Sequence, residues 1–541
     1  MSKKYSLLTC FLFLVILCSA QQPKTSLLYN LVAEKRAQLK QTSKIALFNK
    51  LNTTTNNKIS VTVSERMILS LNKQASLEIY HNKPASISLI IPAAAGIDHT
   101  LELVQQDINS TDEFSIGTIE GNGVMKKAAT EQGLHYRGYI NGDPLSIASF
   151  SVFANGEIVG LFCNDEGNFN LGKTGGSGEY ILFNSKNMLV PLGFECGTSE
   201  IPVPGGDNSI NQLDVPPPTN PIPPATLCKK VRIYWEADYK LYSNNFLSDL
   251  TNTANYLTGL FNQVAVMYQN EGILIELTDT YIWITPDPYN TSTSSNGLAT
   301  FKSRWNGLGD TFKADLAILI DGAPTNNGGI AYLLTNALCN RFYAYGYANV
   351  YASYNTVPTY SWDVEVVTHE MGHMVGSHHT HWCGWNTGAG GTCGAIDDCY
   401  TTEAFGACAS CTALTPTNPS APLGFKGTVM SYCHLRAGIG INLANGFGPL
   451  PQDAIRNTVN IASCAIYDNK WTGTVSTAWE NPANWNCGMI PNATTDVTIP
   501  TGLNNYPVIN SAAICRRIKQ QPNTSVLVKT GFSLTLAGPP N

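Results

Sequence analysis

Charged side chains are scarce in this chain of 541 residues: Asp, Glu, Lys and Arg together make up only 13%, about half the usual share. No basic run is long enough to bind a polyanion, and a net charge of −6 offers nucleic acid no attraction. Downstream of the N-terminus, no uninterrupted apolar run reaches the length of about 18 residues that a transmembrane helix needs. We therefore expect neither a nucleic-acid partner nor a transmembrane segment.

The one concentrated apolar run lies at the N-terminus. Lys3 and Lys4 precede the apolar stretch 7–17, and the small residues Ser19 and Ala20 follow it. This order is typical of a secretory signal peptide, and the run is too short to cross a membrane. We predict a signal peptide over 1–20 and a secreted, extracellular, soluble protein, a setting in which most of the 15 cysteines can form disulfides.

Histidine is also scarce, with 9 residues, yet residues 369–379 read HEMGHMVGSHH. The apolar spacing over 362–375 predicts a helix with Ser361 as its N-cap. His369 and His373 are four residues apart and would project from one side of that helix. Two imidazoles placed in this way suit zinc.

The rest of the stretch completes a catalytic pattern. Gly376 permits the backbone turn that ends the helix, and His379 then supplies a third ligand. Three protein ligands leave one zinc position open, which is the catalytic arrangement. Glu370 lies beside the first ligand, where it can take a proton from a water molecule. His378 and His381 do not fit the ligand spacing.

Further along the chain, residues 428–434 read TVMSYCH. Together with HExxHxxGxxH this resembles the metzincin zinc metalloproteases, in particular the reprolysin (adamalysin) branch. The resemblance implies an α/β catalytic domain with a twisted mixed sheet, an active-site helix and a Met-turn in which Met430 lies beneath one catalytic zinc ion. It also implies that Tyr432 approaches the zinc. Thr380 departs from the branch, which has Asp after the third histidine.

The resemblance implies a peptide or protein substrate, cleaved with Glu370 as general base. The alternative is an extracellular binding or adhesion protein whose zinc site is only structural. An intact Glu370 favours the enzyme, because a structural site has no use for a base. Calcium as a further cofactor stays open, since no clear calcium motif is present.

Six cysteines follow the predicted helix closely: Cys383, Cys393, Cys399, Cys408, Cys411 and Cys433. They could form three disulfides that order the loop before the Met-turn, or a second zinc site. By resemblance to reprolysins, Cys339 would pair with Cys464. In the C-terminal piece, Cys487 would pair with Cys515.

The chain is predicted to be multidomain. Alternating segments such as 86–92 and 157–162 indicate strands, and residues 135–162 resemble the β-rich prodomain of reprolysins, so we expect a prodomain over 21–200. The Pro-rich stretch 201–226 is expected to be an exposed linker in which activating cleavage occurs. The catalytic domain is expected over 227–468.

Within the catalytic domain we expect strands at 231–238, 273–277, 281–284 and 315–320, and an amphipathic helix from Phe246 to near Gly272. The segment GGIAYL at 328–333 resembles the metzincin edge strand that binds substrate; the candidate substrate-binding residues within it are Gly328, Gly329, Ile330 and Ala331.

Residues 469–541 are expected to form a small β-rich accessory module with a strand at 526–538. The module resembles one that is common in exported Bacteroidetes proteins, and it could contact secretion machinery or a cell surface.

Cys196 lies near the end of the predicted prodomain. Metzincin proenzymes often use a prodomain cysteine as a fourth zinc ligand, which displaces the catalytic water and keeps the enzyme latent. Cys196 is therefore a candidate cysteine switch. The alternative is an ordinary disulfide with Cys163 or Cys228.

Overall fold

The computed structural model describes residues 25–538 apart from fifteen short or linker segments. These are 40–41, 53–58, 94–96, 110–113, 122, 176–177, 190–195, 199–227, 323–326, 334–336, 353–356, 388–392, 407, 416–426 and 437. The predicted signal peptide (1–20) and linker (201–226) lie outside the described residues. We call 25–198 the N-terminal region, 228–465 the central region and 466–538 the C-terminal module.

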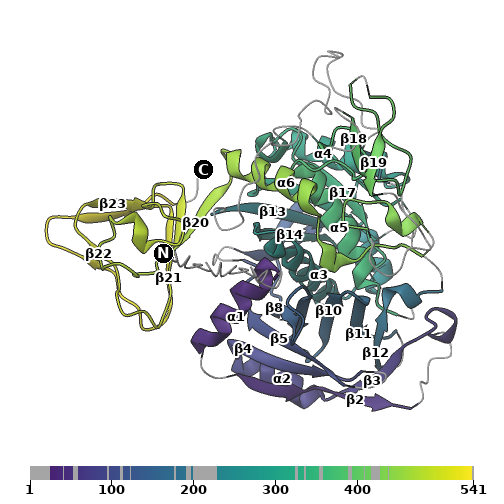
Figure 1. The fold of residues 1–541 in the computed structure, drawn as a ribbon, viewed down its shortest axis with the longest axis horizontal. Helices are drawn as coiled ribbons and strands as arrows, with labels where there is room; N and C mark the ends of the chain where they lie inside the picture. The colour runs from purple at the N-terminus through teal and green to yellow at the C-terminus, as the bar shows by residue number, and fades with distance from the viewer. Residues whose placement is uncertain are drawn as a thin grey trace, which may run out of the picture.

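A ten-stranded sheet forms the N-terminal region, as the prediction of a β-rich segment requires (Figure 1). Two helices, α1 (Leu27–Leu39) and α2 (Lys73–Asn82), accompany it. The predicted strands at 86–92 and 157–162 are β4 and β10. In spatial order the strands are β1 (Ser43–Ala46), β4 (Ser86–Ile91), β5 (His99–Gln105), β8 (Leu134–Ile140), β9 (Ile147–Val152), β10 (Ile158–Asn164), β11 (Gly167–Lys173), β12 (Tyr180–Asn184), β3 (Met67–Leu71) and β2 (Phe48–Leu51).

A mixed sheet forms the centre of the central region. Among its five strands from the central region, neighbours pair in parallel except at the edge strand β16, which is antiparallel to β17. The order is β16 (Gly329–Ala331), β17 (Tyr345–Asn349), β15 (Leu316–Asp321), β13 (Lys229–Ala237) and β14 (Leu274–Trp283). The helices are α3 (Leu250–Asn270), α4 (Ser294–Gly307), α5 (Tyr360–Met374) and α6 (Pro449–Ile461). The predicted α/β class is therefore confirmed.

The prediction of two strands at 273–277 and 281–284 is wrong, because β14 runs unbroken through the polar residues between them. Asp279 and Thr280 pair with a neighbouring strand on each side of β14, which keeps the strand continuous there. Asp279 Oδ1 accepts a hydrogen bond from Ser115 Oγ at 2.6 Å. That partner belongs to the N-terminal region, so the local sequence did not reveal it.

Two strands of the N-terminal region join the central sheet. β6 (Ser115–Glu120) pairs in parallel with β14, and β7 (Val124–Lys127) forms a hairpin with β6. The central sheet therefore does not end at β14. The two regions share one sheet, which a division of the chain at the linker did not anticipate.

Helix α3 begins later than predicted, at Leu250. Leu247 and Ser248 have positive φ angles of 51° and 62°, which a right-handed helix cannot include. Asp249 then caps the helix, because its side chain accepts a hydrogen bond from Asn252 N at 2.9 Å. The expected one-sided burial is also wrong: every residue from 253 to 269 is buried.

The C-terminal module stacks short parallel strands on one another. β20 (Ile466–Lys470) leads to β21 (Thr495–Ile499) and β24 (Arg517–Gln520), while β22 (Val508–Ile509) pairs with β25 (Leu527–Val528) and β23 (Ala512–Cys515) with β26 (Ser533–Leu536). The single strand predicted at 526–538 is thus two strands. A turn separates them, in which Phe532 N donates to Lys529 O at 3.1 Å.

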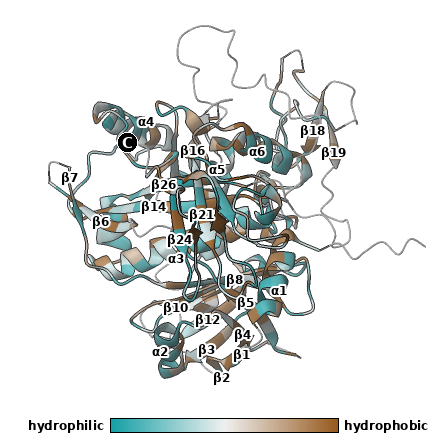
Figure 2. Cartoon of the chain, turned by 90° about the vertical axis from the view of Figure 1, so that its left-hand side faces the viewer, coloured by the Kyte–Doolittle hydropathy of each residue, from teal (hydrophilic) through white to brown (hydrophobic). Residues whose placement is uncertain are grey.

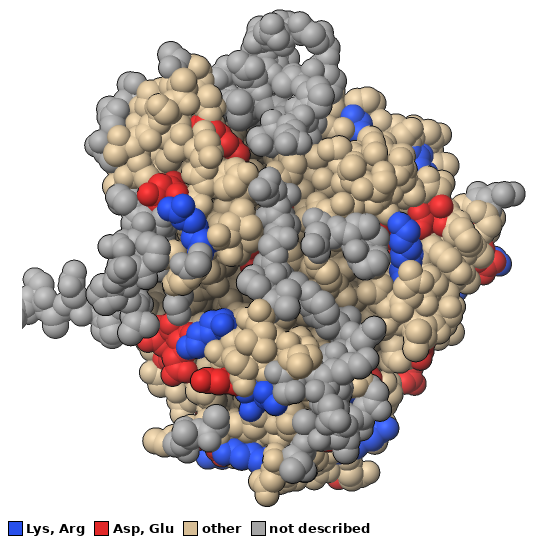
Figure 3. Space-filling view, turned by 90° about the vertical axis from the view of Figure 1, so that its right-hand side faces the viewer, with Lys and Arg blue, Asp and Glu red and all other residues tan. Residues whose placement is uncertain are grey.

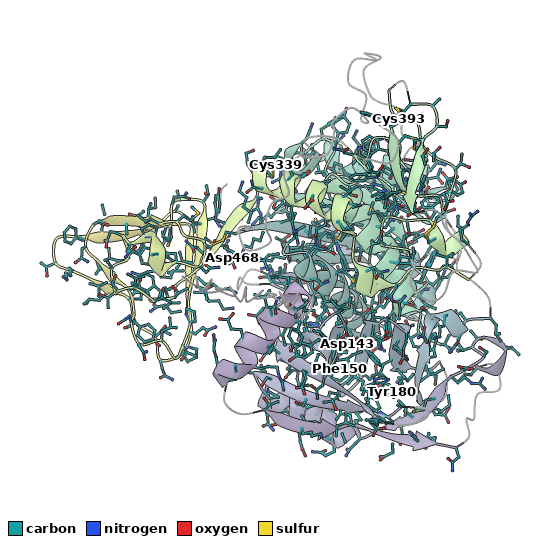
Figure 4. The ribbon with its side chains drawn as sticks, in the orientation of Figure 1. Asp143, Phe150, Tyr180, Cys339, Cys393 and Asp468 are labelled. Carbon is teal, nitrogen blue, oxygen red and sulfur yellow. A yellow bond between two sulfur atoms is a disulfide. The ribbon has the colours of Figure 1, made fainter. Side chains whose placement is uncertain are left out.

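The module is fixed to the central region. β20 pairs with the start of β13. Lys230 of β13 is buried and forms an ion pair with Glu276 of the central region at 2.8 Å. Across the junction it forms a second ion pair with Asp496 of the module at 2.7 Å, and Asp468 of the module is a further acidic partner (Figure 4). Figure 1 shows the module extending to one side of the two larger regions.

The predicted Cys487–Cys515 disulfide is wrong: Cys487 pairs with Cys228. The β13–β20 pairing brings Cys228, just before β13, next to the loop that carries Cys487. Cys515 is a free, buried thiol in the core of the module.

The surface in Figure 3 is mostly uncharged, and its Lys and Arg residues lie among Asp and Glu residues. None of the described helices is long and apolar enough to span a membrane.

Candidate active site

Helix α5 carries the first part of the motif, but it starts two residues before the prediction, and Ser361 is not its N-cap. Thr359 precedes the helix and makes no capping bond with its side chain. The free backbone amide of Ser361 instead donates to Asn170 Oδ1, at 2.7 Å, from β11 of the N-terminal region. Because the cap comes from a remote strand, no local pattern could show it.

The other local predictions for this helix are confirmed. Val364, Val367, Met371 and Met374 are all buried. Gly376 has a φ of +97°, a conformation that favours glycine, and the chain turns there after the helix.

The Met-turn lies directly against the helix. Met430 is fully buried, and a Cβ atom on Gly372 would lie only 2.7 Å from its sulfur. Gly372 sits between His369 and His373, one residue before the second, so its lack of a side chain lets Met430 approach the base of the histidine cluster. Met430 therefore packs against the helical turn that carries His369 and His373.

The three histidines meet with their Nε2 atoms. His373 Nε2 lies 3.1 Å from His369 Nε2 and 3.1 Å from His379 Nε2. Two nitrogens bound tetrahedrally to zinc at about 2.05 Å would lie about 3.3 Å apart. The spacing therefore fits one zinc ion held by all three.

The outer ring nitrogens fix which nitrogen carries the proton. His369 Nδ1 lies 2.7 Å from Val429 O, and His373 Nδ1 lies 2.7 Å from Ser377 O. A carbonyl oxygen only accepts, so each Nδ1 must donate, and burial holds the pKa of both rings well below the ordinary value. The Nε2 atoms therefore present lone pairs to one another. A bound cation would offset the mutual repulsion of these lone pairs.

Cys196 points into the same cluster from the N-terminal region. Its Sγ lies 3.5 Å from His373 Nε2 and 3.4 Å from Glu370 Oε2, and the thiol is unpaired and buried. A sulfur and a nitrogen on one tetrahedral zinc, at about 2.3 and 2.05 Å, would be about 3.6 Å apart. Cys196 and the three histidines thus form a four-atom donor group. The disulfide alternatives for Cys196 are wrong, because Cys163 is free and Cys228 pairs elsewhere.

Comparison with known families agrees with this geometry. Residues 228–418 match the family described as metallo-peptidase family M12 (Reprolysin_5). This part of the chain is a reprolysin-like metzincin domain. The chain is accordingly a zinc metalloendopeptidase.

Other comparisons add less. Residues 470–538 match a family described only as a domain of unknown function (DUF8693). No curated protein matches the chain. Among solved structures, metalloproteinase-II from Bacteroides fragilis is similar at 12% identity and a TM-score of 0.30, over 63% of this chain and 89% of that one.

The edge strand of the metzincin domain touches the predicted base. A Cβ atom on Gly329 would lie 2.2 Å from Glu370 Oε1, so only glycine leaves room for that carboxylate. Burial raises the pKa of Glu370 well above its ordinary value, and hydrogen bonds from Cys196 and Thr198 oppose the rise. A carboxylate with a raised pKa is suited to take up and return a proton.

The Cys196 segment lies along this edge strand. Gly197 N donates to Gly329 O at 3.1 Å, and Ala331 N donates to Thr198 Oγ1 at 3.1 Å. The Tyr432 hydroxyl accepts from Cys196 N at 2.6 Å and donates to Cys196 O at 2.9 Å. Tyr432 is thus close to the histidines but bonded to the backbone of Cys196. Gly328 and Ile330 complete the edge segment.

Thr380, the residue after the third histidine, contacts the Met-turn. Its backbone amide donates to Met430 O at 3.0 Å, and its hydroxyl donates to the same carbonyl oxygen at 3.4 Å. The departure in sequence therefore leaves the third ligand tied to the Met-turn.

Glu403 is a functional residue that sequence reasoning missed. His379 Nδ1 donates to its carboxylate at 2.6 Å, and His381 Nε2 lies 3.3 Å from the same oxygen. Contact with these histidines lowers the pKa of Glu403 below the ordinary value despite its burial. Glu403 lies in a disulfide loop with no motif of its own, so only a search for carboxylates near the ligand could have found it. His378 stacks on Trp382 instead, with ring centres 3.7 Å apart.

The predicted three-disulfide loop is confirmed, and the second zinc site is not needed. The pairs are Cys383–Cys411, Cys393–Cys408 and Cys399–Cys433, around the short strands β18 (Gly394–Asp397) and β19 (Thr412–Thr415) (Figure 4). The predicted Cys339–Cys464 pair is confirmed as well.

Proposed function

We propose that the chain is exported as a latent proenzyme of a zinc endopeptidase. Residues 1–20 are the signal peptide, 21–200 the prodomain, 201–226 the linker, 227–468 the catalytic domain and 469–541 the accessory module. Cys196 is the fourth zinc ligand of the latent form. The observation that carries this proposal is the position of Cys196 Sγ, 3.5 Å from His373 Nε2 and within the histidine donor group.

His369, His373 and His379 would hold the zinc. When bound there, zinc acts as a Lewis acid, lowers the pKa of a water molecule towards ~7 and polarises the scissile carbonyl. Departure of Cys196 leaves Glu370 Oε2 free to accept the proton of the water and return it to the leaving amine.

Tyr432 changes partner at the same step. In the latent form its hydroxyl bonds to the backbone N and O of Cys196. Once that segment leaves, the hydroxyl can donate to the oxyanion that forms at the scissile carbon. Tyr432 is therefore proposed to serve latency first and catalysis afterwards.

The substrate is proposed to be an extended peptide that pairs with the edge strand Gly329–Ala331. The Cys196 segment supports this, because the backbone amide of Gly197 bonds to Gly329 O and the side-chain hydroxyl of Thr198 bonds to the backbone N and O of Ala331. The blocking segment thus occupies backbone groups of the edge strand that an added substrate strand would use.

The test compares two buried, unpaired cysteines in the full chain, using Cys196→Ala and the matched control Cys163→Ala. We expect Cys196→Ala to cleave a fluorogenic peptide without processing, while Cys163→Ala stays latent. Adding Glu370→Ala to the active variant should abolish turnover with zinc still bound. A latent, zinc-loaded Cys196→Ala protein would disprove the switch, and full activity after Glu370→Ala would disprove the base.

The accessory module is proposed to contact secretion machinery or a cell surface. Exposed apolar side chains on β25, on β26 and in the turn between them, namely Leu527, Leu536 and Phe532, support a contact surface. Substitution of these residues by Ser tests it better than truncation, because removing β20 would break the Cys228–Cys487 junction. Unchanged export and unchanged cell binding would remove this role.

A further inference from the structure

Helix α3 lies between the two large regions, with the N-terminal sheet on one side and the central sheet on the other (Figures 1 and 2). A helix on the surface of a free domain keeps one polar, exposed face. Here residues 253–269 are buried all around the helix. Removal of the N-terminal region would therefore expose a whole face of a central helix.

The contact across α3 is close and apolar. A Cβ atom on Gly259 would lie 2.9 Å from Val159 Cγ1 and 3.3 Å from the Phe153 ring. One hydrophobic core runs through both regions and includes Leu28, Ile116, Tyr139, Ile147 and Leu161 together with Trp235, Leu257, Phe261 and Val264. A core shared in this way resembles the interior of one domain rather than an interface between two separable ones.

Buried polar groups on the two sides of this contact form hydrogen bonds with each other. Arg137 Nε donates to Asn262 Oδ1 at 2.9 Å, and Arg137 Nη1 donates to Gln269 Oε1 at 3.1 Å. Asn262 Nδ2 donates in turn to Tyr136 O at 3.2 Å. These residues fix how the N-terminal sheet sits on α3.

Two further contacts make the N-terminal region part of the catalytic framework. β6 continues the central sheet beside β14 over five residue pairs, from Ser115↔Asp279 to Ile119↔Trp283. Asn170 caps the active-site helix, and Asn168 Oδ1 accepts from Leu443 N at 2.9 Å in the segment after the Met-turn.

The blocking segment, by contrast, is held by the proposed bond of Cys196 to zinc and by a few hydrogen bonds. Cys196–Thr198 bond to Tyr432, Gly329 and Ala331. None of these bonds involves α3, β6 or Asn170. The segment can therefore leave the site while the rest of the N-terminal region stays in place.

We infer that the N-terminal region, residues 25–189, remains bound to the central region after the linker is cut, so that the mature enzyme is a two-chain complex. Activation is then a local withdrawal of Cys196–Thr198 and not the loss of a prodomain. The activation step rests on the proposed function. The retained association does not, since it stands on α3 and β6 alone.

The test uses the full chain with one recognition sequence for a site-specific protease inserted within 201–226. All five disulfides of the described residues lie between Cys228 and Cys487, so none joins the two fragments. After cutting, we expect two bands on a non-reducing denaturing gel and a single peak in native size-exclusion chromatography. Native mass spectrometry should give the mass of the complex.

Separate native peaks, with the C-terminal fragment folded and zinc-loaded, would overturn the inference. Peptide cleavage by the cut complex is measured separately. A complex that stays together but remains inactive would count against the proposed activation step and leave the association standing.

Matched variants test whether α3 is the contact that holds the fragments. Val159→Asp places a charge against Gly259 and should weaken the association of the fragments at least a hundredfold, while Val61→Asp, at a position 69% exposed in the same region, should not change it. If Val159→Asp does not fold, Gly259→Ala provides the milder test, with about a tenfold weakening expected. Equal association in the folded contact variant and the control would refute this assignment.

Discussion

Glu403 is expected to control zinc affinity through His379. Its carboxylate accepts the proton of His379 Nδ1 at 2.6 Å, which keeps the lone pair on Nε2 and orients the ring. Two variants test this. Glu403→Gln keeps an acceptor oxygen but removes the charge, and Glu403→Ala removes the acceptor. Each is made in the Cys196→Ala background, so that the thiol cannot serve as an extra ligand.

Partners of zinc-binding histidines typically contribute ten- to hundredfold to metal affinity, or about 1.4–2.7 kcal/mol. A charge-assisted hydrogen bond is roughly twice as strong as a neutral one, so the Gln variant should lose about tenfold. The Ala variant leaves Nδ1 in a buried site without its partner and should lose about a hundredfold. His381 Nε2, 3.3 Å from the same oxygen, would lose its neighbour as well.

The assay is competition for zinc with a chromophoric chelator, together with zinc content after dialysis. Thr401→Ala, at an exposed position of the same loop, is the control. The melting temperature of each metal-free variant separates a weakened site from a weakened fold. If Glu403→Ala binds zinc within twofold of the control, then Glu403 does not tune the site and the argument is wrong.

Three further substitutions test the surroundings of the site. Gly329→Ala in the active form should lower kcat at least tenfold with zinc retained, because its Cβ atom would displace the Glu370 carboxylate; unchanged kcat would contradict the crowding. Asn170→Ala should destabilise the proenzyme by about 1 kcal/mol, measured by denaturant unfolding, since the first turn of α5 loses its cap. Gly372→Ala should cost about 1–3 kcal/mol through contact with Met430, read as a lower melting temperature, and an unchanged value would show that the Met-turn yields freely.

The strands and helices were largely predictable where their pattern is local. The predicted segments at 86–92, 157–162 and 315–320 match β4, β10 and β15. The errors fell where a remote partner changes the local preference. β14 runs through polar residues because β6 pairs with it, and α3 lost its expected exposed face because the N-terminal sheet covers it.

Disulfide pairing was likewise predictable where it is local and not where it depends on remote elements. The six cysteines of the loop after α5 lie close together in the sequence, so the sequence predicted that they form three disulfides with one another, without saying which pairs. The partner of Cys487 was not predicted, because Cys228 comes near it only through the pairing of β20 with β13.

The sequence by itself determined the three-histidine cluster of this protein. His369 and His373 share a side of one helix turn, and Gly376 turns the chain towards His379, so these positions depend on short-range geometry alone. Only the tertiary structure decided that Cys196 meets these ligands, that Glu403 supports the third and that Asn170 caps their helix. The reason is that these residues are far apart along the chain, and distances between such residues are set by how whole sheets and helices pack.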